Sequence, residues 1–153
     1  TCRIPLGAKL LSPELAGGTI VYCTPGASPG ACAAVAATGA HVVTAPADAD
    51  GHADVRAVHQ NLGSRGCLHV LVEGGGEIHA AFLRAGLVDA VAVVVAPKLV
   101  GGRTAPGPIG GVGVVRMLDA VALTDCRMES LGDDFLLRGR LASAGAGATP
   151  NTV

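Results

Sequence analysis

The residues best placed to do chemistry form one short stretch, Glu73-Gly74-Gly75-Gly76. An apolar run at residues 68–72 precedes it, and a helical pattern at residues 77–85 follows. Glycines let a backbone approach a ligand closely, and the unpaired amides and dipole at a helix N-terminus favour a phosphate. The stretch therefore indicates either a phosphate-binding turn or a plain tight turn. The dinucleotide fingerprint GxGxxG is not matched, since counting from Gly74 places His79 at its third glycine.

Glu73 is the second candidate, because it follows an expected strand at the edge where open α/β sheets place their ligands. Its carboxylate has two interpretations that the spacing does not separate. It could accept hydrogen bonds from an amide or amino group of a substrate, or it could cap the amides of the glycine turn.

These residues need a scaffold, and the chain predicts an α/β domain. Near-continuous apolar runs at residues 19–23, 41–45, 68–72 and 88–96 are typical of strands buried on both faces. Helices are expected between them, from Ser28-Pro29 to Gly39, over residues 54–64 and over residues 77–85. The alternation predicts a mixed, mostly parallel sheet flanked by helices. Two runs at residues 117–129 and 135–141 lie too close together for a helix, which predicts a C-terminal antiparallel hairpin.

Three other chemistries are weighed and set aside. Gly26-Ala-Ser-Pro-Gly30 spells the GxSxG of a hydrolase, but Pro29 has no N–H for the oxyanion hole, so Ser28 is interpreted as a helix cap. The five histidines lack the HExxH spacing of zinc hydrolases, so no metal is expected. The five scattered cysteines lack a catalytic context and are expected to be reduced.

Composition excludes further classes. Aromatic residues make up 2% of the chain and the net charge is −1, which argues against a nucleic-acid partner. The longest apolar run, residues 90–97, falls far short of the about 20 residues that span a bilayer, so a cytoplasmic protein without a membrane partner is expected.

Three motifs carry a family resemblance. Val72-Glu-Gly-Gly-Gly76, Phe82-Leu-x-Ala-Gly-Leu-Val-Asp89 and Ala96-Pro-Lys-Leu-Val-Gly101 resemble the C-terminal reductase domain of the bifunctional riboflavin biosynthesis deaminase/reductase. The resemblance implies a dihydrofolate reductase-like, three-layer fold and NADPH as the cofactor. The implied reaction is reduction of 5-amino-6-(5-phosphoribosylamino)uracil, a phosphoribosylaminopyrimidine, to its ribitylamino product.

The resemblance also implies site residues. Glu73 corresponds to the family's substrate-contacting glutamate, and the cofactor segment corresponds to Gly75, Gly76, Glu77, Ile78, His79, Ala80 and Ala81. A homodimer is implied, and no catalytic residue is assigned. Lys98 and Asp89 are interpreted as structural residues of a loop and a turn.

The resemblance also frames the domain organisation. We expect residues 1–142 to form a reductase domain without its N-terminal strands and residues 143–153 to form a disordered tail. The glycine- and proline-rich loop at residues 103–113 is expected to border the active site. Two alternative functions remain: a catalytically incompetent nucleotide-binding or assembly module, and a related pyrimidine or pterin reductase.

Overall fold

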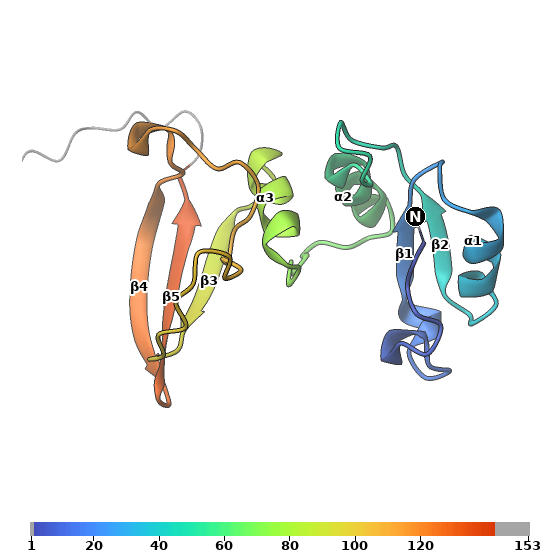
Figure 1. The fold of residues 1–153 in the computed structure, drawn as a ribbon, viewed down its shortest axis with the longest axis horizontal. Coiled ribbons are helices and arrows are strands. Elements are labelled where there is room, and N and C mark those ends of the chain that lie inside the picture. Colours follow the sequence, from blue (N-terminus) through green and yellow to red (C-terminus); the bar gives the residue numbers. More distant parts are fainter. Residues whose placement is uncertain (1, 143–153) are drawn as a thin grey trace, which may run out of the picture. The chain divides into compact units, whose positions relative to one another are not determined.

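The computed structural model describes residues 2–142, so the expected disordered tail lies outside the described residues. The chain divides into two units, Thr1–Leu71 and Val72–Val153, and each contains its own sheet (Figure 1).

The first unit contains two parallel strands and two helices. Ile20 lies opposite His41 and Cys23 opposite Thr44 in the strand pair. The elements in chain order are the 3₁₀ turns Lys9–Leu11 and Ala16–Gly18, β1 (Ile20–Cys23), α1 (Pro29–Ala36), β2 (His41–Thr44) and α2 (Val55–Ser64).

Local signals mark both ends of α1, as predicted, and the start of α2. The Ser28 hydroxyl accepts a hydrogen bond from the Ala31 amide at 3.5 Å, and Pro29 occupies the first position of α1. The Asp54 carboxylate accepts from the Arg56 amide at 2.8 Å at the start of α2. Gly39 follows α1 with φ of 96°, in the left-handed region that glycine adopts without strain.

The core of the first unit lies between its sheet and α1. Successive residues of a strand face opposite sides, so Val21 and Cys23 point to one face together. They pack there with Val35 of α1 and with Leu11 from the first 3₁₀ turn. Tyr22 faces the other way, and its hydroxyl donates a hydrogen bond to Asn61 Oδ1 of α2 at 2.8 Å. The two helices are thus attached to β1 through alternate residues.

The second unit is a helix followed by a three-stranded sheet. Its elements are α3 (Gly76–Arg84), β3 (Ala90–Val95), the 3₁₀ turn Met117–Asp119, β4 (Leu123–Leu131) and β5 (Asp134–Leu141). The strand order is β3-β5-β4 and both pairings are antiparallel. The predicted terminal hairpin is confirmed, and Gly132 makes its tight turn possible with φ of 61°.

The predicted strand at residues 68–72 is wrong for this structure. The segment has no strand assignment and lies at the join between the two units. Leu68 is 89% exposed and Leu71 is 81% exposed. A strand needs a neighbour that supplies its backbone hydrogen bonds, and the described pairings join only β1 to β2 and β5 to β3 and β4.

Two further expectations need correction. β3 was expected in a parallel sheet, but it pairs with β5 alone and antiparallel, from Ala90 opposite Arg140 to Val95 opposite Phe135. β4 begins at Leu123 and not at Met117, because the 3₁₀ turn there is fixed by two hydrogen bonds from Arg116 to Asp119 at 2.8 and 2.9 Å.

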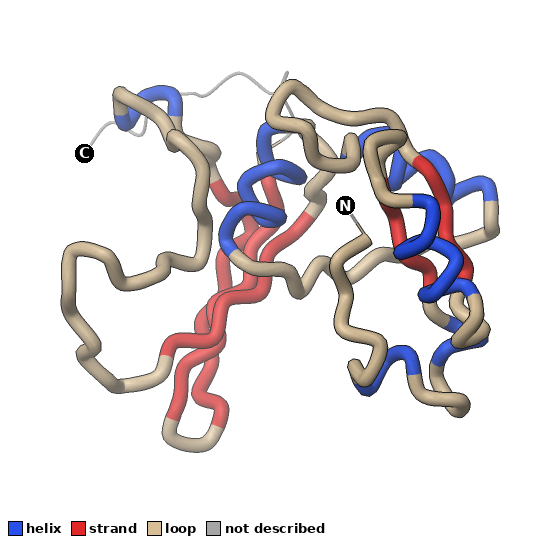
Figure 2. The backbone as a smooth tube through the Cα atoms, turned by 45° about the vertical axis from the view of Figure 1, so that its right-hand side comes forward, coloured by secondary structure: helices blue, strands red, loops and turns tan. Residues whose placement is uncertain are grey.

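A long loop joins β3 to β4 and passes the N-terminal end of α3 (Figure 2). It contains the glycine- and proline-rich residues 103–113. Among the helices of residues 2–142, none combines the length and the apolar character that a bilayer crossing requires.

Candidate functional site

The glycine turn leads directly into α3, as the sequence predicts. Gly75 is the N-cap residue, and its lack of a side chain leaves the helix end without a side-chain cap. The first amides of the helix that bond within it are those of Ile78 and His79, which donate to the Gly75 carbonyl at 3.0 and 3.2 Å. The amides that precede them and the helix dipole give this end a positive potential.

The three glycines differ in what surrounds them. A Cβ on Gly74 would lie 2.5 Å from the Cβ of Ile78, and one on Gly76 would lie 2.9 Å from the Gly110 nitrogen. A Cβ on Gly75 would meet nothing within 4 Å. Two glycines are therefore needed for packing within the chain, whereas the space in front of Gly75 is open to a ligand.

The side chains of Glu77 and His79 face the long loop. Glu77 Oε1 accepts a hydrogen bond from the Gly111 amide at 3.1 Å. His79 Nδ1 lies 2.8 Å from the carbonyl oxygen of Pro108. A carboxylate in the first turn of a helix suits its dipole but repels a phosphate. In this structure the Glu77 carboxylate is engaged by the loop.

The other sequence-predicted residues lie in or next to α3. Ile78 is half exposed and its side chain lies against Gly74, while Ala80 is buried and Ala81 is half-buried in the helix body. Glu73 is exposed immediately before the glycine turn. It follows a segment without strand assignment, so the sheet-edge argument for its role does not apply here.

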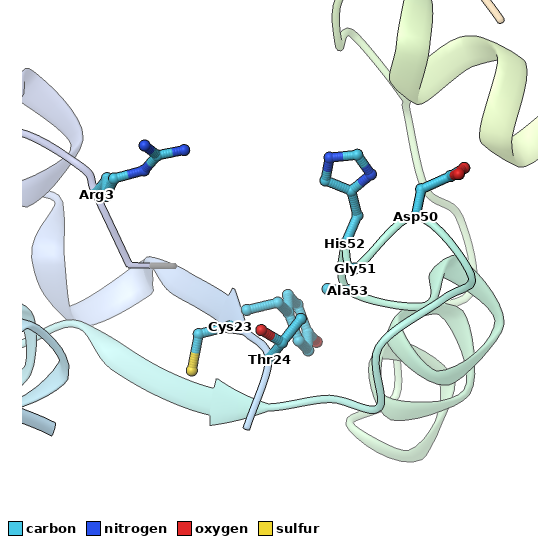
Figure 3. A pocket seen from close by; sticks show the side chains of 8 residues that line it. Arg3, Cys23, Thr24, Asp50, Gly51, His52 and Ala53 are labelled. Carbon is cyan, nitrogen blue, oxygen red and sulfur yellow. The ribbon is translucent and has the colours of Figure 1, made fainter. Parts of the chain in front are cut away.

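A hollow also lies in the first unit, and the sequence analysis does not predict it. Its volume is about 300 Å³, and Thr24 at the carboxyl end of β1 lines it together with the loop after β2. Figure 3 shows the Arg3 guanidinium and the His52 imidazole on opposite sides of the opening, with the Cys23 sulfur directed away from it. The strand-end rule applied to Thr24 would have found this site.

Local hydrogen bonds shape this hollow. The Asp48 carboxylate accepts from the amides of Asp50 and His52 at 3.0 and 2.8 Å, which fixes the turn that carries His52. Tyr22 also lines the hollow, and its partial burial raises the pKa of its phenol above the ordinary value. Arg3, Thr24 and His52 bring hydrogen-bond donors to the hollow, and the acidic Asp50 also lines it.

The serine of the GxSxG pattern has a structural role. Ser28 caps α1, so the structure confirms the interpretation of this serine as a cap. Within residues 2–142, no three His, Cys, Asp or Glu side chains cluster in a way that could hold a metal ion.

Comparisons with known proteins show the family to which the sequence is similar. The sequence matches the family described as the RibD C-terminal domain over residues 1–137. It is 41% identical over 85 residues to riboflavin biosynthesis protein RibD of Synechocystis sp., covering 56% of this chain and 23% of that protein. It is 36% identical over 84 residues to the 2,5-diamino-6-ribosylamino-4(3H)-pyrimidinone 5′-phosphate reductase of Methanothermobacter thermautotrophicus, covering 55% of this chain and 39% of that protein.

A solved structure supports the fold. RibD of Acinetobacter baumannii superposes with a TM-score of 0.72 at 24% sequence identity, over 92% of this chain and 35% of that one. The chain thus spans well under half the length of these proteins. The expected fold of dihydrofolate reductase type is confirmed. Because the family match covers nearly all of the described residues, the chain belongs to the RibD C-terminal domain family.

Proposed function

We propose that this chain reduces 5-amino-6-(5-phosphoribosylamino)uracil to its ribitylamino product in riboflavin biosynthesis, with NADPH as the reductant. One observation carries the proposal: the family match over residues 1–137 includes the glycine turn, which the structure places at the start of α3 with open space at Gly75. Support for the reaction class comes from the archaeal relative, which is named as a pyrimidinone phosphate reductase.

The residues at the start of α3 fit a dinucleotide. The donor set consists of backbone amides, which suit the oxygens of a pyrophosphate. The open face at Gly75 is the kind of surface that a close backbone contact requires, because a Cβ there would occupy the ligand's space. The backbone of residues 75–81 would hold the cofactor, and NADPH supplies a hydride when bound.

Glu73 is proposed to bind the substrate. It is exposed and lies directly before the glycine turn, so its carboxylate is available to a ligand next to that turn. An ionised carboxylate only accepts hydrogen bonds, which matches the amino and ring N–H groups of an aminopyrimidine. Its contribution is orientation of the pyrimidine, and no proton transfer is assigned to it.

We also propose that the chain acts as a homodimer. The strand β3 and the terminal hairpin carry exposed apolar side chains, with Val94 56% and Met128 69% exposed. β4 is an edge strand, so a second copy can pair with its open edge. The same symmetric contact can cover the exposed apolar side chains. Light scattering of the purified chain measures the mass directly; a monomer at all concentrations would contradict this assembly.

The proposed function is tested by a turnover assay. The purified chain is supplied with NADPH and with either the uracil substrate or the 2,5-diamino-pyrimidinone substrate named for the archaeal relative. We expect NADPH oxidation that depends on the uracil substrate and formation of the ribityl product. Oxidation with the diamino substrate alone would indicate the related reductase, and NADPH binding without turnover on either would indicate a nucleotide-binding module.

A further inference from the structure

The five residues from Gly107 to Gly111, here called the strap, lie against the first turn of α3. Gly110 donates its amide hydrogen to the Gly76 carbonyl at 2.8 Å. Gly111 donates to Glu77 Oε1 at 3.1 Å, and His79 Nδ1 contacts the Pro108 carbonyl oxygen at 2.8 Å. Three hydrogen bonds thus join a loop to a helix about 30 residues away in the sequence.

The contact between the strap and the helix leaves little room for a side chain at Gly76, Gly110 or Gly111. A Cβ on Gly76 would lie 2.9 Å from the Gly110 nitrogen and 3.0 Å from the Gly107 oxygen. A Cβ on Gly110 would overlap the Glu77 carboxylate, and one on Gly111 would lie 3.2 Å from the Cβ of Ala80. The absence of side chains at these glycines therefore allows the strap to pack closely against the start of α3.

Polar contacts, and not apolar burial, hold the strap in place. Its one large apolar side chain, Ile109, is 57% exposed, and the following Val112 is 96% exposed. Between the strap and α3 lies a largely apolar hollow of about 450 Å³, which Leu83 and Ile109 help to line. Since the apolar packing is incomplete there, the hydrogen bonds to Gly76, Glu77 and His79 hold the strap against α3.

The contact to Pro108 also determines which ring nitrogen of His79 must carry a proton. A carbonyl oxygen only accepts, so the hydrogen bond requires the proton to be on Nδ1 of the imidazole. An asparagine places an amide N–H donor near the position of Nδ1, whereas an alanine removes the donor. Position 79 therefore offers both a loss variant and a conservative rescue.

We propose that Glu77 and His79 are positioning residues that bind the strap to α3 and so hold the glycine turn in the shape that receives the cofactor. This inference rests on the proposed function and deepens it, because it gives the side chains of two residues in the cofactor segment a role in holding the strap. The strap closes the side of the turn at Gly76 and leaves the side at Gly75 open. Preorganisation of this kind lowers the cost of ordering a site when its ligand binds.

Amide hydrogen exchange measured by NMR tests the strap without any cofactor. Gly110 and Gly113 each follow a β-branched residue, so their intrinsic exchange rates are closely matched. We expect the Gly110 amide to exchange roughly fivefold or more slowly than that of Gly113, since one hydrogen bond contributes about that factor. His79→Ala should remove the protection and His79→Asn should keep it. Equal rates for Gly110 and Gly113 in the unmodified chain would overturn the strap.

Titration with NADPH then tests the positioning role. We expect His79→Ala and Glu77→Ala each to raise the dissociation constant roughly fivefold and to raise KM far more than they lower kcat. His79→Asn should restore binding, and His59→Ala, at an exposed histidine of α2, is the matched control. Faster exchange at Gly110 with unchanged NADPH affinity would overturn the positioning role, and so would tighter binding.

The two proposals fail in distinguishable ways. If the unmodified chain binds no NADPH, the proposed function and the positioning role are both refuted. The exchange rates of Gly110 and Gly113 still show whether the strap is hydrogen-bonded to α3. If NADPH binds and the exchange rates are equal, the attachment of the strap is refuted and the proposed function is not.

Discussion

Replacing Gly75 and Gly76 one at a time separates ligand contact from packing within the chain. We predict that Gly75→Ala leaves the free energy of unfolding within about 0.5 kcal/mol of the original. Its φ of −67° and ψ of 173° suit alanine, and the added Cβ meets nothing within 4 Å. The poorer capping by alanine is offset by a smaller loss of chain entropy on folding, each being about 0.5 to 1 kcal/mol.

Gly76→Ala should behave differently, although it lies only one residue away. Alanine gains about 1 kcal/mol in helix propensity. Against this, its Cβ would lie 2.9 Å from the Gly110 nitrogen, so the strap must move and its hydrogen bond to the Gly76 carbonyl weakens. Overpacking costs about 1 to 3 kcal/mol and the hydrogen bond about 1 kcal/mol, so the net loss is about 1 to 3 kcal/mol. At roughly 4 °C per kcal/mol, Tm should fall by about 4 to 12 °C.

Two assays read out this pair. Circular dichroism on heating gives Tm, and NADPH fluorescence gives the affinity with little background because the chain has no Trp. We predict that Gly75→Val weakens NADPH binding at least tenfold, or about 1.4 kcal/mol, while the chain stays folded. If Gly75→Ala destabilised the chain as much as Gly76→Ala, the open face at Gly75 would be refuted. Unchanged NADPH affinity in a folded Gly75→Val chain would refute the glycine turn as the cofactor site.

Three further predictions concern other parts of the chain. Glu73→Gln should raise KM for the pyrimidine more than it weakens NADPH binding, because a carboxylate acceptor is lost beside an intact turn; equal effects on both would remove the substrate role. Asp54→Ala should lower the free energy of unfolding by about 1 kcal/mol in urea denaturation through loss of the α2 cap, whereas no change would contradict the 2.8 Å bond to the Arg56 amide. Tyr22, as the only tyrosine, can be titrated by ultraviolet absorbance, and its pKa should exceed the ordinary value because burial disfavours the phenolate. The folded state then holds its proton longer, so the free energy of unfolding should fall as the pH rises from the ordinary phenol pKa through the raised one; a pKa at or below the ordinary value would contradict the burial.

Elements with local signals could be predicted from the sequence. Ser28, Pro29 and Gly39 define α1, and Asp54 defines the start of α2, because capping depends on residues within a few positions of one another. The hairpin of β4 and β5 can be predicted for the same reason, because the segment between the two strands is too short for a helix. The glycine turn at the start of α3 also belongs to this group.

Pairing between distant segments could not be predicted. The runs at residues 68–72 and at β3 are both rich in apolar residues, yet only β3 is paired, with β5. An apolar run indicates a tendency to be buried. It does not indicate which strand will supply the hydrogen bonds or in which direction that strand runs. The misplaced strand then led to a sheet-edge argument for Glu73 that the structure does not support.

The site shows the same division. The family resemblance implies that Glu77 and His79 belong to a cofactor segment, but the partners of their side chains come from a loop about 30 residues away. The hollow at Arg3, Thr24 and His52 likewise joins three segments that are separate in sequence. No local sequence pattern predicts contacts between such distant segments, because these contacts depend on the tertiary fold.

The reduction itself is tested most directly with NADPH that carries deuterium in the position of the transferred hydride. The chain is incubated with this cofactor and 5-amino-6-(5-phosphoribosylamino)uracil, and the product is examined by mass spectrometry. We predict one deuterium in the ribityl chain of the product and one NADPH oxidised for each product formed. A folded chain that binds NADPH but yields no deuterated product would contradict the proposed reductase.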